Sequence, residues 1–112
     1  MTVEDLPPSI CDAVARYATA ARARFGARLS ELRVFGSYAR GDAEEHSDVD
    51  VFVVIDAPTY AETRWLEGLP GEILLDTQVL LSATVFSTAD FELWTRHDRR
   101  LVRDAMREGF AV

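Results

Sequence analysis

The chain has 112 residues, of which 48% are hydrophobic, and this suits one domain over residues 1–112 with a small core. Its formal net charge of -7 opposes the electrostatic attraction that dominates general binding to nucleic acids. All 12 basic residues are arginine, so chemistry that requires a lysine, such as a Schiff base or a P-loop, is excluded.

Cysteine usage and hydropathy indicate the compartment. Cys11 is the only cysteine, so no internal disulfide can form. The N-terminal residues lack the basic start and apolar run of a signal peptide, and nowhere do about 18 apolar residues follow one another. We therefore expect a cytoplasmic protein that has no membrane partner.

The first third of the chain predicts a helix, a strand and a turn. Apolar residues recur at helical spacing over residues 9–25, with Ser9 as the expected N-cap and Gly26 as the stop. Residues 31–35 are β-branched and aromatic, which predicts a first strand. This strand runs into a single helical turn at residues 37–40.

The middle of the chain predicts two further strands with a helix between them. Residues 41–47 form a charged, glycine-containing loop, and the apolar run 48–55 is typical of a central strand covered on both faces. A short helix is expected over 59–70, where Pro70 ends it. Residues 72–81 are again strand-like.

The last part of the chain predicts a helix followed by a tail. Residues 88–108 alternate apolar side chains with arginines and acids, and residues 110–112 form a tail or a short edge strand. The element order therefore predicts an α/β (α+β) fold, in which helices flank a small mixed sheet.

Two aspartates at the head of the strand 48–55 are candidate metal ligands. Side chains alternate along a strand, so Asp48 and Asp50 point to one face with Cα atoms roughly 6.6 Å apart. Their repulsion is on the order of 3 kcal/mol at an effective dielectric near 20. Magnesium offsets such repulsion because it takes carboxylate oxygens and shares its other positions with phosphates. The alternative is that Asp48 caps a turn and Asp50 is a solvated strand end.

Three neighbouring features favour the metal hypothesis. Asp76 lies inside the apolar run 72–81, where an ionised acid is costly unless it is paired or bound to metal. Its alternative is a sheet-edge aspartate bonded to the backbone. Gly36 lets the backbone approach a ligand, and Ser37 can donate to phosphate oxygens. Arg40 can pair with phosphate or with an acid of the following loop.

The strings "GSYARG" and "SDVDVFVV", separated by a short acidic loop, resemble the motif of the DNA polymerase beta-like nucleotidyltransferase superfamily. The resemblance implies that Gly36 and Ser37 bind the triphosphate of a nucleotide, and Arg40 remains a further candidate for binding it. It also implies that Asp48 and Asp50 bind two Mg²⁺ ions together with a third carboxylate from a neighbouring strand. Asp76 is the best match for that third position.

The short chain looks like the minimal nucleotidyltransferase subgroup, whose members are often partnered with a small helical HEPN-type protein. The resemblance therefore implies a Mg-dependent enzyme that transfers NMP, in particular AMP from ATP, to a hydroxyl of such a partner, and thereby acts as an antitoxin. Two alternatives stay open. One is an antibiotic-type enzyme, for which a homodimer supplies the missing wall of the acceptor pocket. The other is a non-catalytic antitoxin that acts by binding alone.

Overall fold

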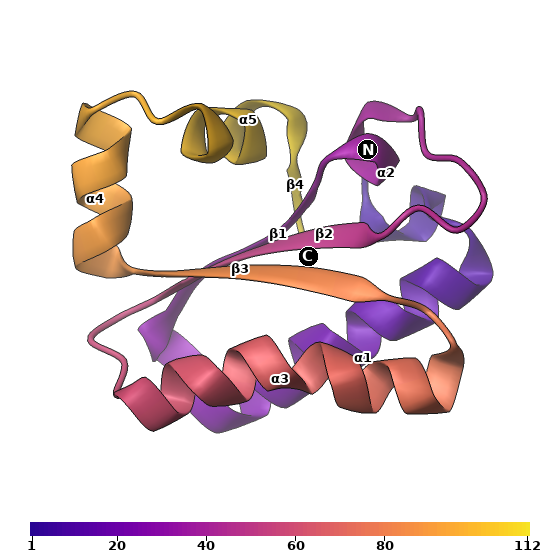
Figure 1. Ribbon diagram of the computed structural model, residues 1–112, viewed down its shortest axis with the longest axis horizontal. Coiled ribbons are helices and arrows are strands. Elements are labelled where there is room, and N and C mark those ends of the chain that lie inside the picture. Colours follow the sequence, from indigo (N-terminus) through magenta and orange to yellow (C-terminus); the bar gives the residue numbers. More distant parts are fainter.

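The structure, a computed structural model, describes residues 1–112 and contains a four-stranded mixed sheet between two helical layers (Figure 1). The spatial order of the strands is β3-β2-β1-β4. Strand β1 (Leu29–Phe35) runs antiparallel to β2 (Val49–Ile55) and to β4 (Phe110–Ala111), whereas β2 runs parallel to β3 (Leu81–Ser87). The expected α/β fold with a small mixed sheet is confirmed.

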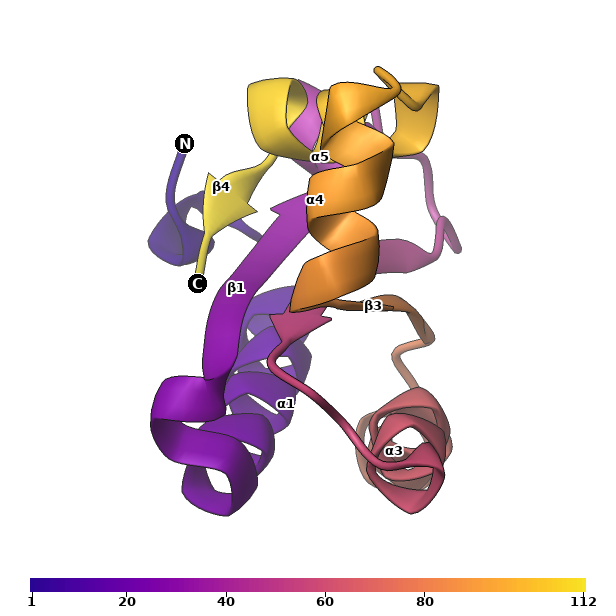
Figure 2. The same cartoon turned by 90° about the vertical axis from the view of Figure 1, so that its left-hand side faces the viewer.

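Helices cover both faces of the sheet, as the view from the side shows (Figure 2). One face carries α1 (Pro8–Phe25) and α3 (Tyr60–Thr77), and the other carries α4 (Thr88–Arg96) and α5 (Arg100–Glu108). The helices leave β2 almost fully buried, with its alternate side chains in two separate cores. None of the helices combines the length and the apolar character needed to span a bilayer.

The elements predicted for the first half of the chain are confirmed. Helix α1 ends at Phe25, with Gly26 as its C-cap, but it begins earlier than predicted because Pro7 is the N-cap and Pro8 opens the first turn. The strand predicted over 31–35 is β1, which starts two residues earlier. The predicted helical turn is α2 (Ser37–Arg40). Short 3-10 turns also occur at Val3–Asp5 and Gly26–Arg28.

The predicted end of the next helix is wrong. Helix α3 continues through Pro70 and ends at Thr77, so the strand predicted over 72–81 does not exist, and β3 starts only at Leu81. Proline has no N–H, so it leaves the carbonyl oxygen of Leu66 without its usual helical partner. The hydroxyl of Tyr17 donates to this oxygen at 2.9 Å from helix α1. The helix therefore tolerates the proline because another element satisfies the freed carbonyl.

The single helix predicted over 88–108 is two helices, α4 and α5. The chain turns between them at His97–Arg99, where Asp98 adopts a positive φ of 51°. This turn allows α5 to return over the sheet instead of extending away from it (Figure 2). Strand β4 follows and pairs with β1, so of the two alternatives for residues 110–112, a tail or a short edge strand, the edge strand is the one that forms.

Candidate active site

The turn after β1 brings the backbone against an acidic side chain. Phe35, the last residue of β1, pairs with Asp50 of β2, and Gly36 follows with φ 74° and ψ -151°. Residues other than glycine rarely adopt these backbone angles. A Cβ placed on Gly36 would lie 2.1 Å from Oδ2 of Asp50. Glycine is therefore required both by the backbone conformation and by the close approach of the carboxylate.

The turn and Asp50 line a hollow of about 490 Å³ between the sheet and α5. This volume lies in the range of ligand pockets. Helix α2 contributes Ser37 and Arg40, and the lining is completed by Phe35, Gly36, Arg100, Leu101, Asp104 and Glu108. The structure therefore brings four of the six residues identified from the sequence to one cavity.

Arg40 connects the two walls of this cavity. Its Nε donates to Asp42 at 3.2 Å in the loop after α2, and its Nη1 donates to Glu108 at 3.3 Å on α5. The guanidinium is partly exposed, with 45% of the side-chain surface accessible. These two carboxylates fix the arginine at the mouth of the cavity, where it can meet an incoming anion.

Asp50 carries the signs of an uncompensated negative charge. Partial burial raises the pKa of its carboxyl, the nearby charge of Asp48 raises it further, and Arg40 lowers it. Asp48 itself comes directly before β2 and is exposed. It lines a second hollow, beside Tyr38 and Leu80, rather than the cavity of Asp50. The two aspartates are thus close enough to interact electrostatically, although each lines a different hollow.

The third predicted carboxylate is not part of this site. Asp76 lies in the last turn of α3, where 69% of its side chain is exposed, and Arg16 of α1 approaches it at 3.8 Å. The prediction failed because it placed Asp76 on a strand next to β2, whereas α3 packs on the opposite face of the sheet from Asp50. No cluster of three or more His, Cys, Asp or Glu side chains lies close enough to hold a metal ion.

The donors that are present nevertheless fit magnesium bound together with a nucleotide. Mg²⁺ is usually held by one or two carboxylates and completes its shell with phosphate oxygens and water. Asp48 and Asp50 supply two carboxylates, and the raised pKa of Asp50 shows that a cation beside it would be favourable. They do not supply the three-carboxylate set that the motif resemblance implies.

Sequence reasoning missed the wall that α5 contributes. Arg100, Asp104 and Glu108 follow one another on one face of this helix and line the cavity opposite the Gly36 turn. If residues 88–108 formed a single helix, as the sequence predicts, these three residues would lie on an ordinary solvent-exposed face. Only the turn at Asp98 brings them over the sheet, and neither glycine nor proline marks that turn in the sequence.

A comparison with known families identifies the class of protein to which this site belongs. Residues 14–106 match the nucleotidyltransferase domain. A candidate protein adenylyltransferase of Methanocaldococcus jannaschii is 30% identical over 100 residues, which cover 87% of this chain and 91% of the relative. The chain therefore belongs to the nucleotidyltransferase family and is an enzyme of the nucleotide-binding type.

Two solved structures share the fold. A toxin-antitoxin with AMP-PNP has a TM-score of 0.51 at 15% identity, and the match covers 86% of this chain and 69% of that one. A candidate nucleotidyltransferase from Sulfolobus solfataricus has a TM-score of 0.50 at 16% identity, with 92% and 85% covered. At this identity the likeness extends to the fold alone.

Proposed function

We propose that the chain transfers AMP from ATP to a hydroxyl of a partner protein, and that the partner is a small helical toxin of the HEPN type. The observation that carries this proposal is the contact between the Gly36 turn and the Asp50 carboxylate inside a nucleotide-sized cavity. The name of the M. jannaschii relative supports protein as the acceptor, and the toxin-antitoxin neighbour supports a toxin as the partner.

The proposed roles follow from the chemistry of each group. The Ser37 hydroxyl and the Arg40 guanidinium bind phosphate oxygens of ATP at the mouth of the cavity. Asp48 and Asp50 hold magnesium, which when bound neutralises charge on the triphosphate. The acceptor hydroxyl comes from the partner, a role supported by the name of the M. jannaschii relative, a protein adenylyltransferase.

Labelled ATP, Mg²⁺ and the protein encoded by the adjacent gene test the proposal. The wild-type chain is expected to transfer label to the partner, and Asp50→Asn is expected to abolish the transfer. Asp76→Asn is the matched control, because it removes the same charge at an exposed position on the other layer. It is expected to label like the wild type. A wild-type chain that labels no partner contradicts the proposal.

One observation favours the alternative of an antitoxin that acts by binding alone. The residues beside the aspartates on the neighbouring segment, Leu80 just before β3 and Ser82 and Thr84 within it, include no carboxylate. If binding alone neutralises the toxin, neutralisation survives when Asp48 and Asp50 are both replaced by asparagine. If transfer is required, the double variant fails to neutralise although it still binds.

A further inference from the structure

Strand β3 offers no third acid to the site. In the parallel pair of β2 and β3, Asp50 is in register with Ser82, and Phe52 is in register with Thr84. Paired residues of adjacent strands face the same side of a sheet, and the shared core of Phe52 and Phe86 agrees with this register. The side chains next to Asp50 on its own face of β3 are therefore hydroxyls.

Helix α5 places two other acids at the same cavity. The carboxylate of Glu108 accepts a hydrogen bond from Arg40 at 3.3 Å, and this bond fixes the position of the side chain. Asp104 accepts no hydrogen bond, and its one ion pair, with Arg100 at 3.6 Å, joins it to a side chain that is 85% exposed. Exposed pairs of this kind contribute about 0–1 kcal/mol, so the carboxylate of Asp104 is available to a substrate.

We infer that Asp104 is the general base of the transfer, an inference that depends on the proposed function. An oxygen of Asp104 accepts the proton of the acceptor hydroxyl as that oxygen bonds to the α-phosphorus of ATP. The bond from the α-phosphorus to the bridging oxygen of pyrophosphate breaks, and pyrophosphate leaves with the electron pair. The proton then passes from Asp104 to solvent, which restores the carboxylate.

The test separates binding from transfer. Asp104→Asn is expected to leave the affinity for ATP unchanged and to lower the transfer rate by about 100-fold, which is the low end for loss of a general base. Asp104→Glu is expected to recover part of the rate. Glu92→Gln removes a charge from an exposed position on α4 and serves as the control.

A gain of function sharpens the test. Ser82→Asp in the Asp104→Asn background sets a carboxylate beside Asp50 and is expected to raise the rate again. If Asp104→Asn transfers label within about threefold of the wild type, the inference falls while the proposed function stands. If the wild type labels nothing, the proposed function fails as well. Thermal unfolding of each variant shows whether the fold is retained.

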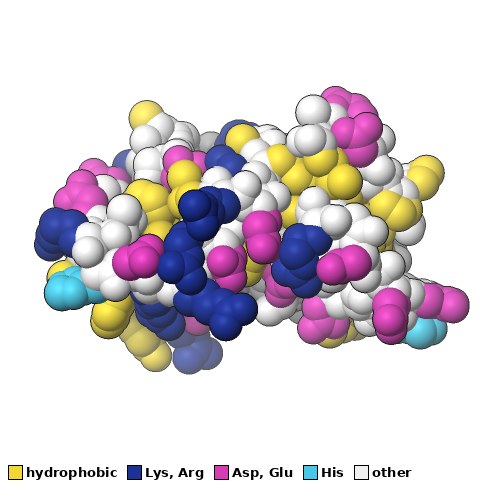
Figure 3. Space-filling view, turned by 90° about the horizontal axis from the view of Figure 1, so that it is seen from above, with side chains coloured by type: hydrophobic (Ala, Val, Ile, Leu, Met, Phe, Trp, Pro, Cys, Tyr) yellow, Lys and Arg dark blue, Asp and Glu magenta, His cyan; other side chains and the backbone are white.

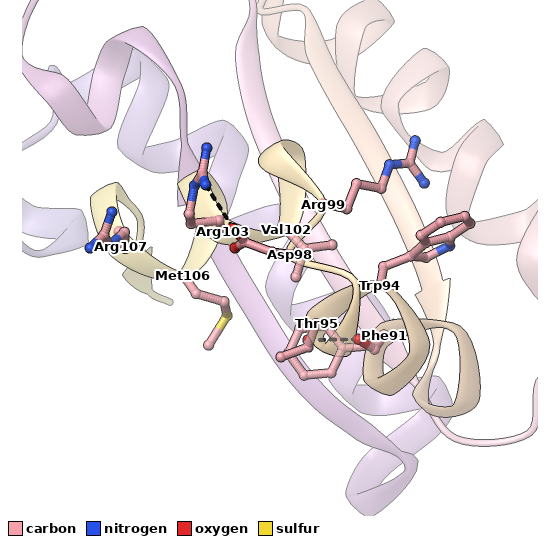
Figure 4. Close-up of a pocket in the computed structure, with 9 residues that line it drawn as sticks. All are labelled: Phe91, Trp94, Thr95, Asp98, Arg99, Val102, Arg103, Met106 and Arg107. Atoms are coloured by element: carbon pink, nitrogen blue, oxygen red, sulfur yellow. Dashed lines mark hydrogen bonds and ion pairs between the residues drawn. The ribbon is translucent and has the colours of Figure 1, made fainter.

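A second hollow, of about 330 Å³, lies between α4 and α5 on the other side of α5 from the nucleotide cavity. In Figure 4 its apolar side chains, among them Phe91, Val102 and Met106, lie between arginines. Trp94 stacks under Arg99, whose guanidinium carbon is 5.0 Å from the ring centroid. The hollow is therefore an apolar depression with a basic rim.

The charge around this hollow is opposite to that of the whole chain. Residues 96–107 contain five of the 12 arginines and only two acids, although the chain carries -7 overall. Arginine side chains gather over this end of the molecule in the space-filling view (Figure 3). Arg107 on the rim is exposed and forms no ion pair, whereas Arg103 pairs with Asp98 at 3.0 Å.

We propose, independently of the base assignment, that this hollow binds an acidic segment of the partner protein, with one apolar side chain inserted between α4 and α5. The charge complementarity favours an acidic protein, and the position beside α5 would bring the partner close to the nucleotide cavity. The arginines then pair with the acids that flank the inserted side chain.

The experiment measures partner affinity and ATP affinity in parallel. Arg107→Glu is expected to weaken binding of the adjacent-gene protein by about tenfold or more and to leave ATP affinity unchanged. Arg64→Glu makes the same change at an exposed position on α3 and is expected to have no effect. The proposal is overturned if Arg107→Glu binds the partner as tightly as the wild type does. It is also overturned if, with a single-stranded RNA as a further probe, the variant loses affinity for the RNA and not for the partner.

Discussion

Gly36→Ala tests the geometry on which the site depends. The added Cβ would lie 2.1 Å from Oδ2 of Asp50, whereas such contacts are not seen below 3.0 Å, so the carboxylate must move by about 1 Å. A displacement of this size in a catalytic group, the role proposed for Asp50, can lower the rate about 100-fold. The backbone conformation adds a strain of about 1–3 kcal/mol. We therefore expect both slower transfer and a lower free energy of unfolding.

Gly26→Ala is the matched control. Gly26 has φ 54° and ψ -129°, a related backbone conformation, but a Cβ there meets nothing within 4 Å. This variant should lose stability through strain alone and keep its transfer rate. Urea unfolding and transfer of label from ATP measure the two effects.

A thermodynamic cycle isolates the contact with the carboxylate. In an Asp50→Ala background Oδ2 and Cγ are absent and only the Cβ of residue 50 remains, at 3.3 Å, so the cost of Gly36→Ala should fall toward that of Gly26→Ala. The reasoning is refuted if Gly36→Ala transfers label within a few-fold of the wild type. It is also refuted if the stability loss from Gly36→Ala is the same with and without the Asp50 side chain.

Three further variants test the fold and the site. Tyr17→Phe leaves the buried carbonyl of Leu66 unpaired, so urea unfolding should show a loss of about 1–3 kcal/mol; no loss would mean that water replaces the hydroxyl. The hydrogen bond from Arg28 lowers the pKa of Glu62 from 4.5 to about 2. The stabilisation that this ion pair gives the folded state is present above pH 4.5 and fades toward pH 2. The urea midpoints of the wild type and Glu62→Gln should therefore converge as the pH is lowered. A constant difference between the two midpoints contradicts this. Burial and a neighbouring charge raise the pKa of Asp50, so its ionised form destabilises the native state. Asp50→Asn should therefore be more stable than the wild type at pH 7 but not at pH 3. A lower urea midpoint for Asp50→Asn at pH 7 contradicts this.

The sequence was sufficient where short-range patterns decide the structure. Helix α1 shows apolar residues at helical spacing, and β1 and β2 are short apolar runs bounded by turn residues. The turn at Gly36 follows from local chemistry, since the residue after β1 must adopt a positive φ. For this reason the grouping of Gly36, Ser37, Arg40 and Asp50 around one cavity could be predicted.

The error at Asp76 arose from a contact that spans 49 positions in the sequence. Proline normally ends or kinks a helix, and the apolar residues after Pro70 then suggest a strand. Whether the helix continues depends on a donor for the carbonyl of Leu66, and Tyr17 is that donor. No local pattern reveals this partner, and the misplaced strand carried Asp76 with it to the wrong face of the sheet.

The position of Asp50 explains how a buried strand can present a charge. Along its face of β2, Phe52 is fully buried under Val102 and Ala105 of α5, in the core cluster they share. Asp50 lies two residues earlier, where this apolar cover gives way to the cavity. The carboxylate is buried enough for its pKa to rise, yet open enough to meet a ligand. Because α5 also contributes Asp104 to the cavity, the helix that closes the core on this face also forms the wall opposite the Gly36 turn.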